Sequence, residues 1–229
     1  MSSHPTDTHI LNAIEYMAKK QARPASGSTR NLETQAAILG AAAEVLQEHG
    51  YGGFSIDAVA RRCGAGRPTI YRWWPNKAAL LVEVYISQSI SITRPAPNTG
   101  SVRGDLIQHI RRLWRFWTET PSGRAFRALV AESQADPAAL VQLRDQALPQ
   151  ARFLVATVLR RGIERGEIVG DIDLELVIDL IWGFNWYRLL TDRLDSKSIE
   201  AMIDLLLTGI RARQSPSAGK AARTAAGRK

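Results

Sequence analysis

The chain has 229 residues and a formal net charge of +8, and 45% of its residues are hydrophobic, so it can bury a substantial core in one domain or two small ones. Its single cysteine, Cys63, excludes an internal disulfide and fits a reducing compartment, so a cytoplasmic protein is expected. No apolar run approaches the roughly 18 residues of a membrane-spanning helix, and the N-terminus lacks a secretory pattern. Neither a membrane span nor a signal peptide is therefore predicted.

The first 32 residues are predicted to be a partly disordered N-terminal extension. The apolar residues of the segment 9–20, HILNAIEYMAKK, follow helical spacing, so a short amphipathic helix is one interpretation. The other interpretation is a flexible N-terminal segment that is only transiently helical. Residues 21–31 contain proline and glycine among small polar residues, which is typical of a linker.

Regular helical patterning begins at Glu33. The alanine-rich segment 32–50 favours a helix, which Gly50 is predicted to end. The expected buried stripe of this helix comprises Ile38, Ala41, Val45 and Leu46.

Two short helices are predicted next, and a glycine-containing turn joins them. Ser55 is expected to cap the first of them, and Gly64 to end it. The second carries Pro68 in its first turn and ends before Pro75, because a residue that precedes proline avoids the α region. Asn76 is expected to cap a long helix that follows. Such a pair of short helices is typical of a helix-turn-helix unit. Its expected core comprises Ile56, Val59, Ala60, Ile70, Trp74 and Cys63, the last as a buried, inert thiol.

Positive charge is concentrated in this unit. All five basic residues of the segment 33–85 lie between Arg61 and Lys77, and its five acidic residues lie outside that stretch. The sequence from Gly66 to Leu81, GRPTIYRWWPNKAALL, combines cations with aromatic residues and contains no acidic residue. A buried helix does not need this chemistry, whereas a surface that binds a polyanion can use all of it.

The second half of the chain is predicted to be helical as well. The Pro/Gly-rich segment 93–101 is expected to be a loop between sub-domains, and six helices are predicted beyond it. Among the expected helix starts are Asp136, Pro149, Asp173 and either Ser196 or Ser198. No segment alternates convincingly with period two, so the fold is predicted to be all-α. Residues 215–229 lack large apolar residues and are expected to be a disordered basic tail, which either solubilises the chain or holds DNA loosely.

The stretch from Ala37 to Tyr85 resembles the N-terminal DNA-binding domain of TetR/AcrR-type bacterial transcriptional regulators. The matching segments are AAAEVLQEHGY, FSIDAVARRCGAG and PTIYRWWPNKAALL. The remainder is similar to the family in style only, although residues 160–190 resemble its dimerisation region. The resemblance implies a three-helix DNA-binding domain over 33–85. It also implies a helical bundle over 86–214 that binds a small molecule and forms a dimer.

The sequence departs from the family pattern at two positions of the third helix. Gly66 stands where the family often has serine, so the cap of this helix must differ. Trp73 replaces a histidine or a similar residue, so no known operator sequence can be transferred to this chain. The N-terminal extension is also longer than usual.

The resemblance implies that the third helix enters the major groove of DNA. Arg67 and Thr69 are the expected base contacts, since arginine can bind guanine and threonine offers a hydroxyl and a methyl group. Tyr71 and Lys77 match positions that usually bind phosphates. Trp73 either contacts thymine methyls and sugars or covers the fold, and Arg61 and Arg62 are interpreted as a solvated face. The complete predicted DNA-binding set is Ser55, Arg67, Pro68, Thr69, Tyr71, Arg72, Trp73 and Lys77.

Aromatic residues are abundant in the C-terminal half, and aromatic side chains with a few polar groups line many small-molecule pockets. The predicted ligand-binding residues are Trp114, Trp117, Phe126, Trp182, Asn185 and Trp186, and packing in the core is the alternative for each. His109 is interpreted as a surface residue or as one whose hydrogen bonds are satisfied.

No motif of a phosphate-binding loop, a zinc protease, a CxxC site or a serine hydrolase is present, so no enzyme, metal site or cofactor is predicted. The working hypothesis is a homodimeric DNA-binding regulator, a repressor that a small-molecule effector releases from a palindromic operator. The alternatives are a ligand-dependent activator of the same fold and a helical small-molecule-binding protein that does not read DNA.

Overall fold

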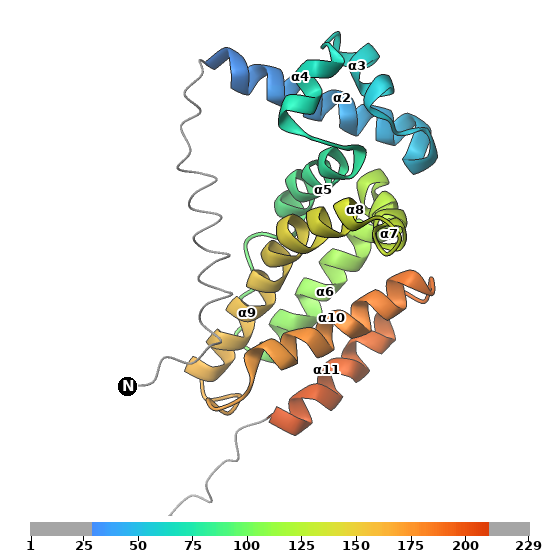
Figure 1. Cartoon of the computed structure of the whole chain (residues 1–229). Helices are drawn as coiled ribbons and strands as arrows, with labels where there is room; N and C mark the ends of the chain where they lie inside the picture. The colour runs from blue at the N-terminus through green and yellow to red at the C-terminus, as the bar shows by residue number, and fades with distance from the viewer. Residues whose placement is uncertain (1–28, 211–229) are drawn as a thin grey trace, which may run out of the picture.

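The computed structural model describes residues 29–210, and these residues form an all-helical structure (Figure 1). The N-terminal helices are α2 (Thr29–Gly53), α3 (Ile56–Cys63), α4 (Arg67–Trp73) and α5 (Lys77–Thr93). The C-terminal helices are α6 (Val102–Glu119), α7 (Pro121–Ser133), α8 (Pro137–Gln142), the π-helical segment η1 (Leu143–Ala147), α9 (Leu148–Glu164), α10 (Leu174–Leu190) and α11 (Ser196–Ile210). The all-α prediction is confirmed. The segment 9–20 and the basic tail 215–229 lie outside the described residues.

Side-chain caps set most of the predicted helix boundaries. The Ser55 hydroxyl accepts a hydrogen bond from the Ala58 backbone N–H at 3.2 Å, and Asn76 Oδ1 accepts one from Ala79 at 2.8 Å. Gly64 ends α3 with φ of 68°, a left-handed conformation that glycine adopts without strain. Asp136 and Asp173 cap α8 and α10 in the same way as Ser55 caps α3, and α11 begins at Ser196 as predicted.

The structure corrects one helix boundary. Gly50, with φ of 60°, kinks α2, and the helix resumes as far as Gly53 instead of stopping. Pro149 lies in the first turn of α9, as predicted, but no break precedes this helix, because α8 continues through η1 into α9 without leaving the helical region. A proline clashes with the carbonyl of the residue four positions earlier, and a π-helical turn, in which the Leu148 N–H bonds to the Leu143 carbonyl, accommodates it.

The helices form an N-terminal unit of α2, α3 and α4 and a C-terminal bundle, and α5 runs from one to the other (Figure 1). α5 contacts α2 on one side and α6, α7, α8 and η1 on the other. It continues without a break across the predicted domain boundary at residues 85 and 86, so the two regions share one helix. No helix within residues 29–210 is long and apolar enough to cross a membrane.

Candidate nucleic-acid interface and pocket

The helix-turn-helix unit is anchored by apolar side chains on the inner faces of its helices. Val59 of α3, Ile70 of α4 and Trp74 directly after α4 are buried in one core with α2 and α5. The predicted stripe of α2 is buried there too. Cys63 was expected in this core, but its side chain is only half-buried, because it lies in the last turn of α3 beside the exposed Gly64.

The opposite face of α4 lies at the surface. Ile70 and Trp74 point inward, and this orientation leaves Arg67 and Tyr71, and likewise Pro68 and Arg72, as outward pairs four residues apart. Tyr71 is 44% exposed. Thr69 is half-buried on the side of the helix. As the glycine at the cap position implies, the Gly66 N-cap of α4 makes no side-chain hydrogen bond. α4 therefore presents two cations and an aromatic hydroxyl on a short, exposed helix.

Arg67 is held by an acidic neighbour that sequence reasoning did not assign to it. Arg67 Nε lies 2.7 Å from Asp57 Oδ1 in the first turn of α3, and both side chains are about half exposed. An exposed ion pair contributes about 0–1 kcal/mol, so the guanidinium can exchange this partner for a base edge. Asp57 therefore orients Arg67 without immobilising it.

Trp73 is half-buried and packs against the core, and its ring centroid lies 6.4 Å from that of Trp74. The guanidinium carbon of Arg72 lies 5.8 Å from the Trp73 ring centroid. The indole N–H is buried and has no hydrogen-bond partner in the described part of the chain. The Trp73 ring therefore packs α4 against the core of the unit. Its contact with thymine methyls remains a prediction.

Lys77 packs against the protein in a way that the sequence did not indicate. Its Nζ lies 3.9 Å from the centroid of the Tyr51 ring, a cation–π contact at the end of α2. The Tyr51 hydroxyl donates a hydrogen bond to Glu132 of α7. Burial, and then the Glu132 carboxylate, raise the pKa of Tyr51, so the hydroxyl keeps its proton. Lys77, Tyr51 and Glu132 therefore link the start of α5 to the C-terminal bundle.

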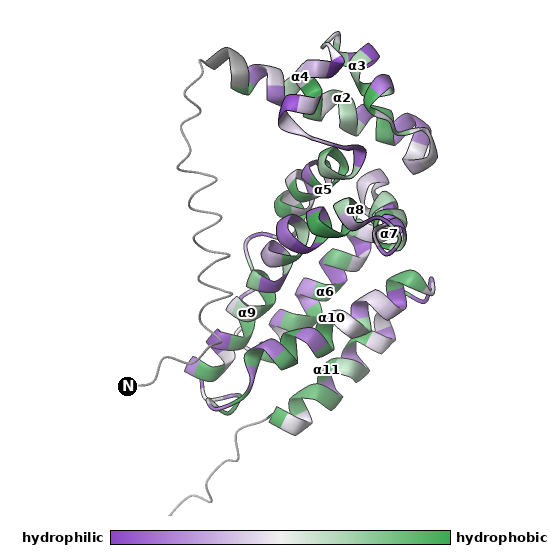
Figure 2. Ribbon diagram, viewed as in Figure 1, coloured by the Kyte–Doolittle hydropathy of each residue, from purple (hydrophilic) through white to green (hydrophobic). Residues whose placement is uncertain are grey.

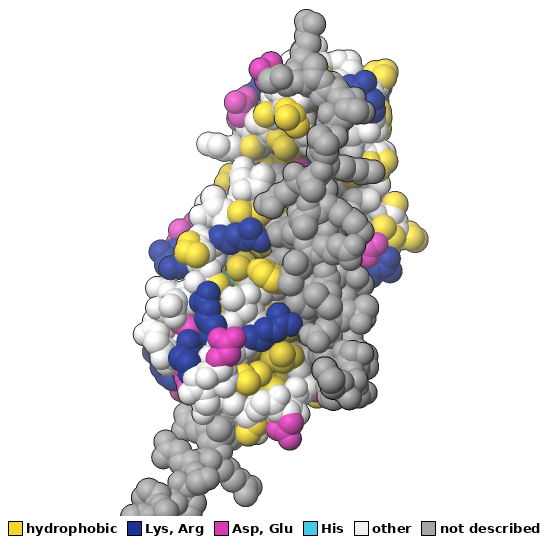
Figure 3. Space-filling model, turned by 90° about the vertical axis from the view of Figure 1, so that its left-hand side faces the viewer, with side chains coloured by type: hydrophobic (Ala, Val, Ile, Leu, Met, Phe, Trp, Pro, Cys, Tyr) yellow, Lys and Arg dark blue, Asp and Glu magenta, His cyan; other side chains and the backbone are white. Residues whose placement is uncertain are grey.

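The two arginines of α3 differ. Arg61 is exposed, whereas Arg62 forms ion pairs with Glu44 and Glu48 and thereby joins α3 to α2. Charge alone does not identify the DNA-binding surface, because Lys and Arg side chains also lie over the C-terminal half of one side of the molecule (Figure 3). The cap of α3 leaves the hydroxyl hydrogen of Ser55 free to donate to a phosphate.

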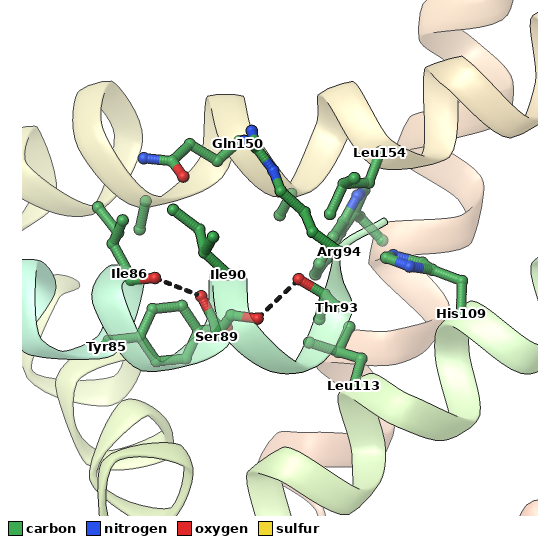
Figure 4. A pocket seen from close by; sticks show the side chains of 13 residues that line it. Tyr85, Ile86, Ser89, Ile90, Thr93, Arg94, His109, Leu113, Gln150 and Leu154 are labelled. Atoms are coloured by element: carbon green, nitrogen blue, oxygen red, sulfur yellow. Dashed lines mark hydrogen bonds between the residues drawn. The ribbon is translucent and has the colours of Figure 1, made fainter. Parts of the chain in front are cut away.

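A pocket lies within the C-terminal bundle between α5, α6, α9 and α10 (Figure 4). Of the six predicted ligand-binding residues, Trp182 lines it. The other five lie outside its lining, and their ligand-binding role remains a prediction. Residues that line the pocket and that sequence reasoning missed include Arg94, His109, Gln150, Ile86 and Leu154.

Most of the predicted aromatic set is paired within the core. The Trp114 indole donates to Asn185 Oδ1, and the Trp117 indole donates to the Tyr85 hydroxyl at 3.1 Å. Phe126 stacks on Tyr85 with ring centroids 4.0 Å apart. Trp186 is half-buried, and its indole N–H has no partner among the described residues. These contacts support the packing alternative, because the polar atoms of Trp114 and Trp117 are already satisfied.

His109 was interpreted as a surface residue or as one whose hydrogen bonds are satisfied, and both interpretations were wrong. Its side chain is 2% exposed, and neither ring nitrogen has a hydrogen-bond partner among residues 29–210. Burial, and then the nearby Arg112 charge, lower the pKa of His109 to about 4, so the imidazole is neutral at neutral pH. One ring nitrogen therefore carries a proton to donate, and the other can accept.

Comparison with known proteins agrees with this geometry. A family model for "Bacterial regulatory proteins, tetR family" matches residues 38–84, and one for "Tetracyclin repressor-like, C-terminal domain" matches residues 96–206. The chain is similar to the uncharacterized HTH-type transcriptional regulator YdeS of Bacillus subtilis, with 33% identity over 202 residues that cover 88% of this chain and 98% of YdeS. It is also similar to the DNA-binding transcriptional repressor TetR of Mycobacteroides abscessus, with 33% identity over 184 residues that cover 80% of this chain and 94% of that one.

A solved structure shows the same fold at the same level of sequence similarity. The TetR family transcription regulator SCO0332 superposes with a TM-score of 0.68 and 33% identity, covering 78% of this chain and 98% of that one. The helix-turn-helix geometry, both family models and relatives that match over most of their length place the chain in the TetR family of DNA-binding transcriptional regulators, which are not enzymes.

Proposed function

We infer that the chain is a homodimeric transcriptional repressor that binds a palindromic operator in the cytoplasm and is released by a small-molecule effector. Residues 33–85 bind DNA, and residues 86–214 form the dimer and hold the effector. The observation that supports this proposal is the combination of an exposed cationic surface on α4 with an exposed apolar face on α10. The first supplies one reading unit per protomer, and the second supplies the contact that joins two of them.

The apolar face of α10 has the spacing of a helix that packs against another helix. Its exposed residues recur alternately four and three residues apart, which is the repeat of a two-helix seam. They are Leu176, Leu180, Gly183, Tyr187 and Leu190. Leu176, Leu180 and Tyr187 are each more than half exposed, and nothing lies within 4 Å of the Cβ position of Gly183. Leu205 of α11 is 78% exposed, and hydrophobic residues run along both helices (Figure 2). Contiguous apolar surface of this kind favours a protein–protein interface.

A two-fold axis through this face gives each dimer two copies of α4. The two helices read two half-sites in successive major grooves, so the operator is an inverted repeat. In each half-site Arg67 and Thr69 contact base edges, and Tyr71, Lys77 and Ser55 contact phosphates. The Lys77–Tyr51–Glu132 link joins the start of α5, which follows α4, to α7 of the C-terminal bundle.

An effector acts through α5. Three residues separate this helix from α4, and it also lines the pocket with Tyr85, Ile86 and Ile90. A ligand that fits a different position of α5 shifts the separation of the two α4 helices. It weakens DNA binding only by as much as it prefers that state. Repression is supported by the relative from Mycobacteroides abscessus, which is a repressor.

Selection of bound sequences from a random DNA pool, with the affinity of the selected duplex measured against salt, tests this proposal. An enriched inverted repeat with a steep loss of affinity at higher salt is expected. Enrichment of no sequence, or of a single half-site without its inverted copy, contradicts it. An activator of the same fold would also select an inverted repeat, but it would raise transcription from a template that carries the repeat.

Arg67→Ala is expected to weaken binding to the selected duplex by about 1–3 kcal/mol and to relax one base preference in each half-site. Repeating the selection with the variant measures this effect. Arg61→Ala, which removes an exposed cation of α3, is expected to keep the base preference. Asp57→Ala breaks the ion pair of Arg67 but keeps its guanidinium available to a base edge, so it should also keep the preference. Unchanged selectivity in Arg67→Ala would show that Arg67 does not read a base.

Lys77→Ala is expected to weaken binding to all DNA sequences alike. It should lower the slope of log affinity against log salt by about one for each phosphate that the lysine neutralises. Fluorescence anisotropy at several salt concentrations measures both quantities, with Arg115→Ala on α6 as the control cation outside the DNA-binding domain. A variant with the affinity and salt slope of the parent would rule out the phosphate contact.

A further inference from the structure

The C-terminal pocket concentrates polar atoms that the protein does not satisfy. Six buried side-chain nitrogen and oxygen atoms of the described residues have no hydrogen-bond partner, and four of them belong to residues that line this one pocket. They are both ring nitrogens of His109, Oε1 of Gln150 and Nε1 of Trp182. These atoms come from α6, α9 and α10, so no single helix accounts for them. Folded proteins leave few buried polar groups unpaired, and such a cluster therefore indicates a polar partner from outside the chain.

The charge of the lining favours an anion. Arg94 lies at the end of α5, is half-buried, and its guanidinium forms no ion pair within residues 29–210. None of the described residues that line the pocket is acidic. Arg112 lies nearby and raises the local positive potential at His109. The hydroxyl groups of Ser89 and Thr93 already donate to carbonyls of their own helix, at 3.1 Å and 2.7 Å (Figure 4). The unused donors are the Arg94 guanidinium, one ring N–H of His109 and the indole N–H of Trp182, and they suit the acceptor oxygens of an anion. Gln150 Oε1 and the second ring nitrogen of His109 are unused acceptors.

The remaining walls are apolar. They comprise Ile86, Ile90, Leu113, Ala151 and Leu154. The space that the centre of a water molecule can reach is about 20 Å³, room for roughly one water. A larger ligand must therefore displace side chains, and the long side chains of Arg94 and Gln150 are the ones able to swing. η1 precedes Gln150 directly and contributes Ala147 to the lining, and π-helical turns often occur at functional sites.

We propose that this pocket binds a small organic acid, with its carboxylate on Arg94 and the neighbouring donors and its apolar body between α5, α6 and α9. The inference rests on the proposed function only in taking this acid as the effector. The carboxylate accepts from the Arg94 guanidinium and from the N–H groups of His109 and Trp182. The apolar body contacts Ile86 and Ile90 of α5, so its insertion moves the helix that begins next to α4.

The test uses the full chain and matched pairs of probes. Sodium 3-phenylpropanoate and sodium octanoate are titrated by calorimetry beside 3-phenylpropanamide and octanamide, which share their carbon skeletons but carry no charge. We expect at least one acid to bind with a one-to-one protomer stoichiometry, and about tenfold to a hundredfold more tightly than its amide, because hydrogen bonds to a charged group are the stronger ones. Binding by neither acid, or equal affinity for acid and amide, would overturn the proposal.

Substitutions at Arg94 separate charge from packing. Arg94→Met should remove the preference for the acid over its amide, whereas Arg94→Lys, which keeps the charge, should retain it. Arg115→Met removes an exposed arginine of α6 that does not line the pocket and should bind as the parent does. Trp182→Phe keeps an aromatic ring but removes one donor, so it should weaken acid binding by about three- to tenfold. An acid preference that survives in Arg94→Met would overturn the assignment of the carboxylate.

The same samples distinguish this inference from the proposed function. If the acid binds and releases the protein from its selected duplex, the result supports both the acid-binding site and the proposed function. If the acid binds and the DNA complex persists, the site is correct and the acid is not the effector. If DNA selection succeeds and no acid binds, the ligand class is wrong and the DNA-binding function is unaffected.

Discussion

Leu180→Asp is expected to convert the proposed dimer into monomers and to lower the affinity for the selected inverted repeat by about a hundredfold or more. Leu180 lies within the exposed apolar face of α10, and a two-fold interface would bury the introduced carboxylate twice without a partner. A monomer binds one half-site and loses the gain of two linked contacts, which is typically about 10²–10⁴-fold. Sedimentation velocity and fluorescence anisotropy measure the two effects.

Leu140→Asp is the matched control for this substitution. Leu140 is an exposed leucine of α8, away from the α10 face, so the same chemical change there should leave both the dimer and the DNA affinity intact. A dimer that persists in Leu180→Asp would show that another surface joins the protomers. Monomers that still bind the inverted repeat with full affinity would show that dimerisation does not contribute to reading it.

Gly123→Ala is expected to destabilise the protein by about 3 kcal/mol or more. Gly123 lies in the first turn of α7, and the single residue Thr120 separates α7 from α6. A Cβ at position 123 would overlap the carbonyl oxygen of Phe116 and lie 2.7 Å from the Cα of Trp117. These are backbone atoms of a packed helix, so they cannot move aside as a flexible side chain would.

Urea unfolding measures the loss of stability, and Gly40→Ala serves as the control. Gly40 lies within α2 with nothing within 4 Å of its Cβ position, so alanine there should be neutral or stabilise by about 0.5–1 kcal/mol. Equal stability of Gly123→Ala and the parent would contradict the close approach of α7 to α6. Because Phe116 and Trp117 lie beside the pocket-lining Tyr85, disruption of this packing should also weaken the binding of any ligand that the pocket holds.

The helices were predictable because their boundaries depend on local chemistry. A serine, asparagine or aspartate before a helix, a glycine after it and a proline that stops it act over three or four residues, so Ser55, Gly64 and Asn76 could be assigned from the sequence alone. Pro149 marks the first turn of α9, but the sequence does not show that a π-helical segment joins α8 to α9 without a break, because this depends on packing around the turn.

The pocket was less predictable because it depends on contacts between distant helices. Helical spacing assigns Trp114 and Trp117 to a buried face but does not reveal that Asn185 and Tyr85 satisfy their indoles. Arg94 and His109 carry no sequence signal that separates a pocket residue from a surface residue. The pairing of Arg67 with Asp57 and the packing of Lys77 on Tyr51 escaped prediction for the same reason.

The most direct test of the central claim compares two labelled duplexes of equal length, one with the selected inverted repeat and one with a single half-site. Anisotropy titrations across salt concentrations measure affinity and stoichiometry for each. We predict that one dimer binds the inverted repeat about a hundredfold or more tightly than the half-site, with the steeper salt dependence. Equal affinity and equal salt slope for both duplexes would contradict a dimer that reads DNA through two copies of α4.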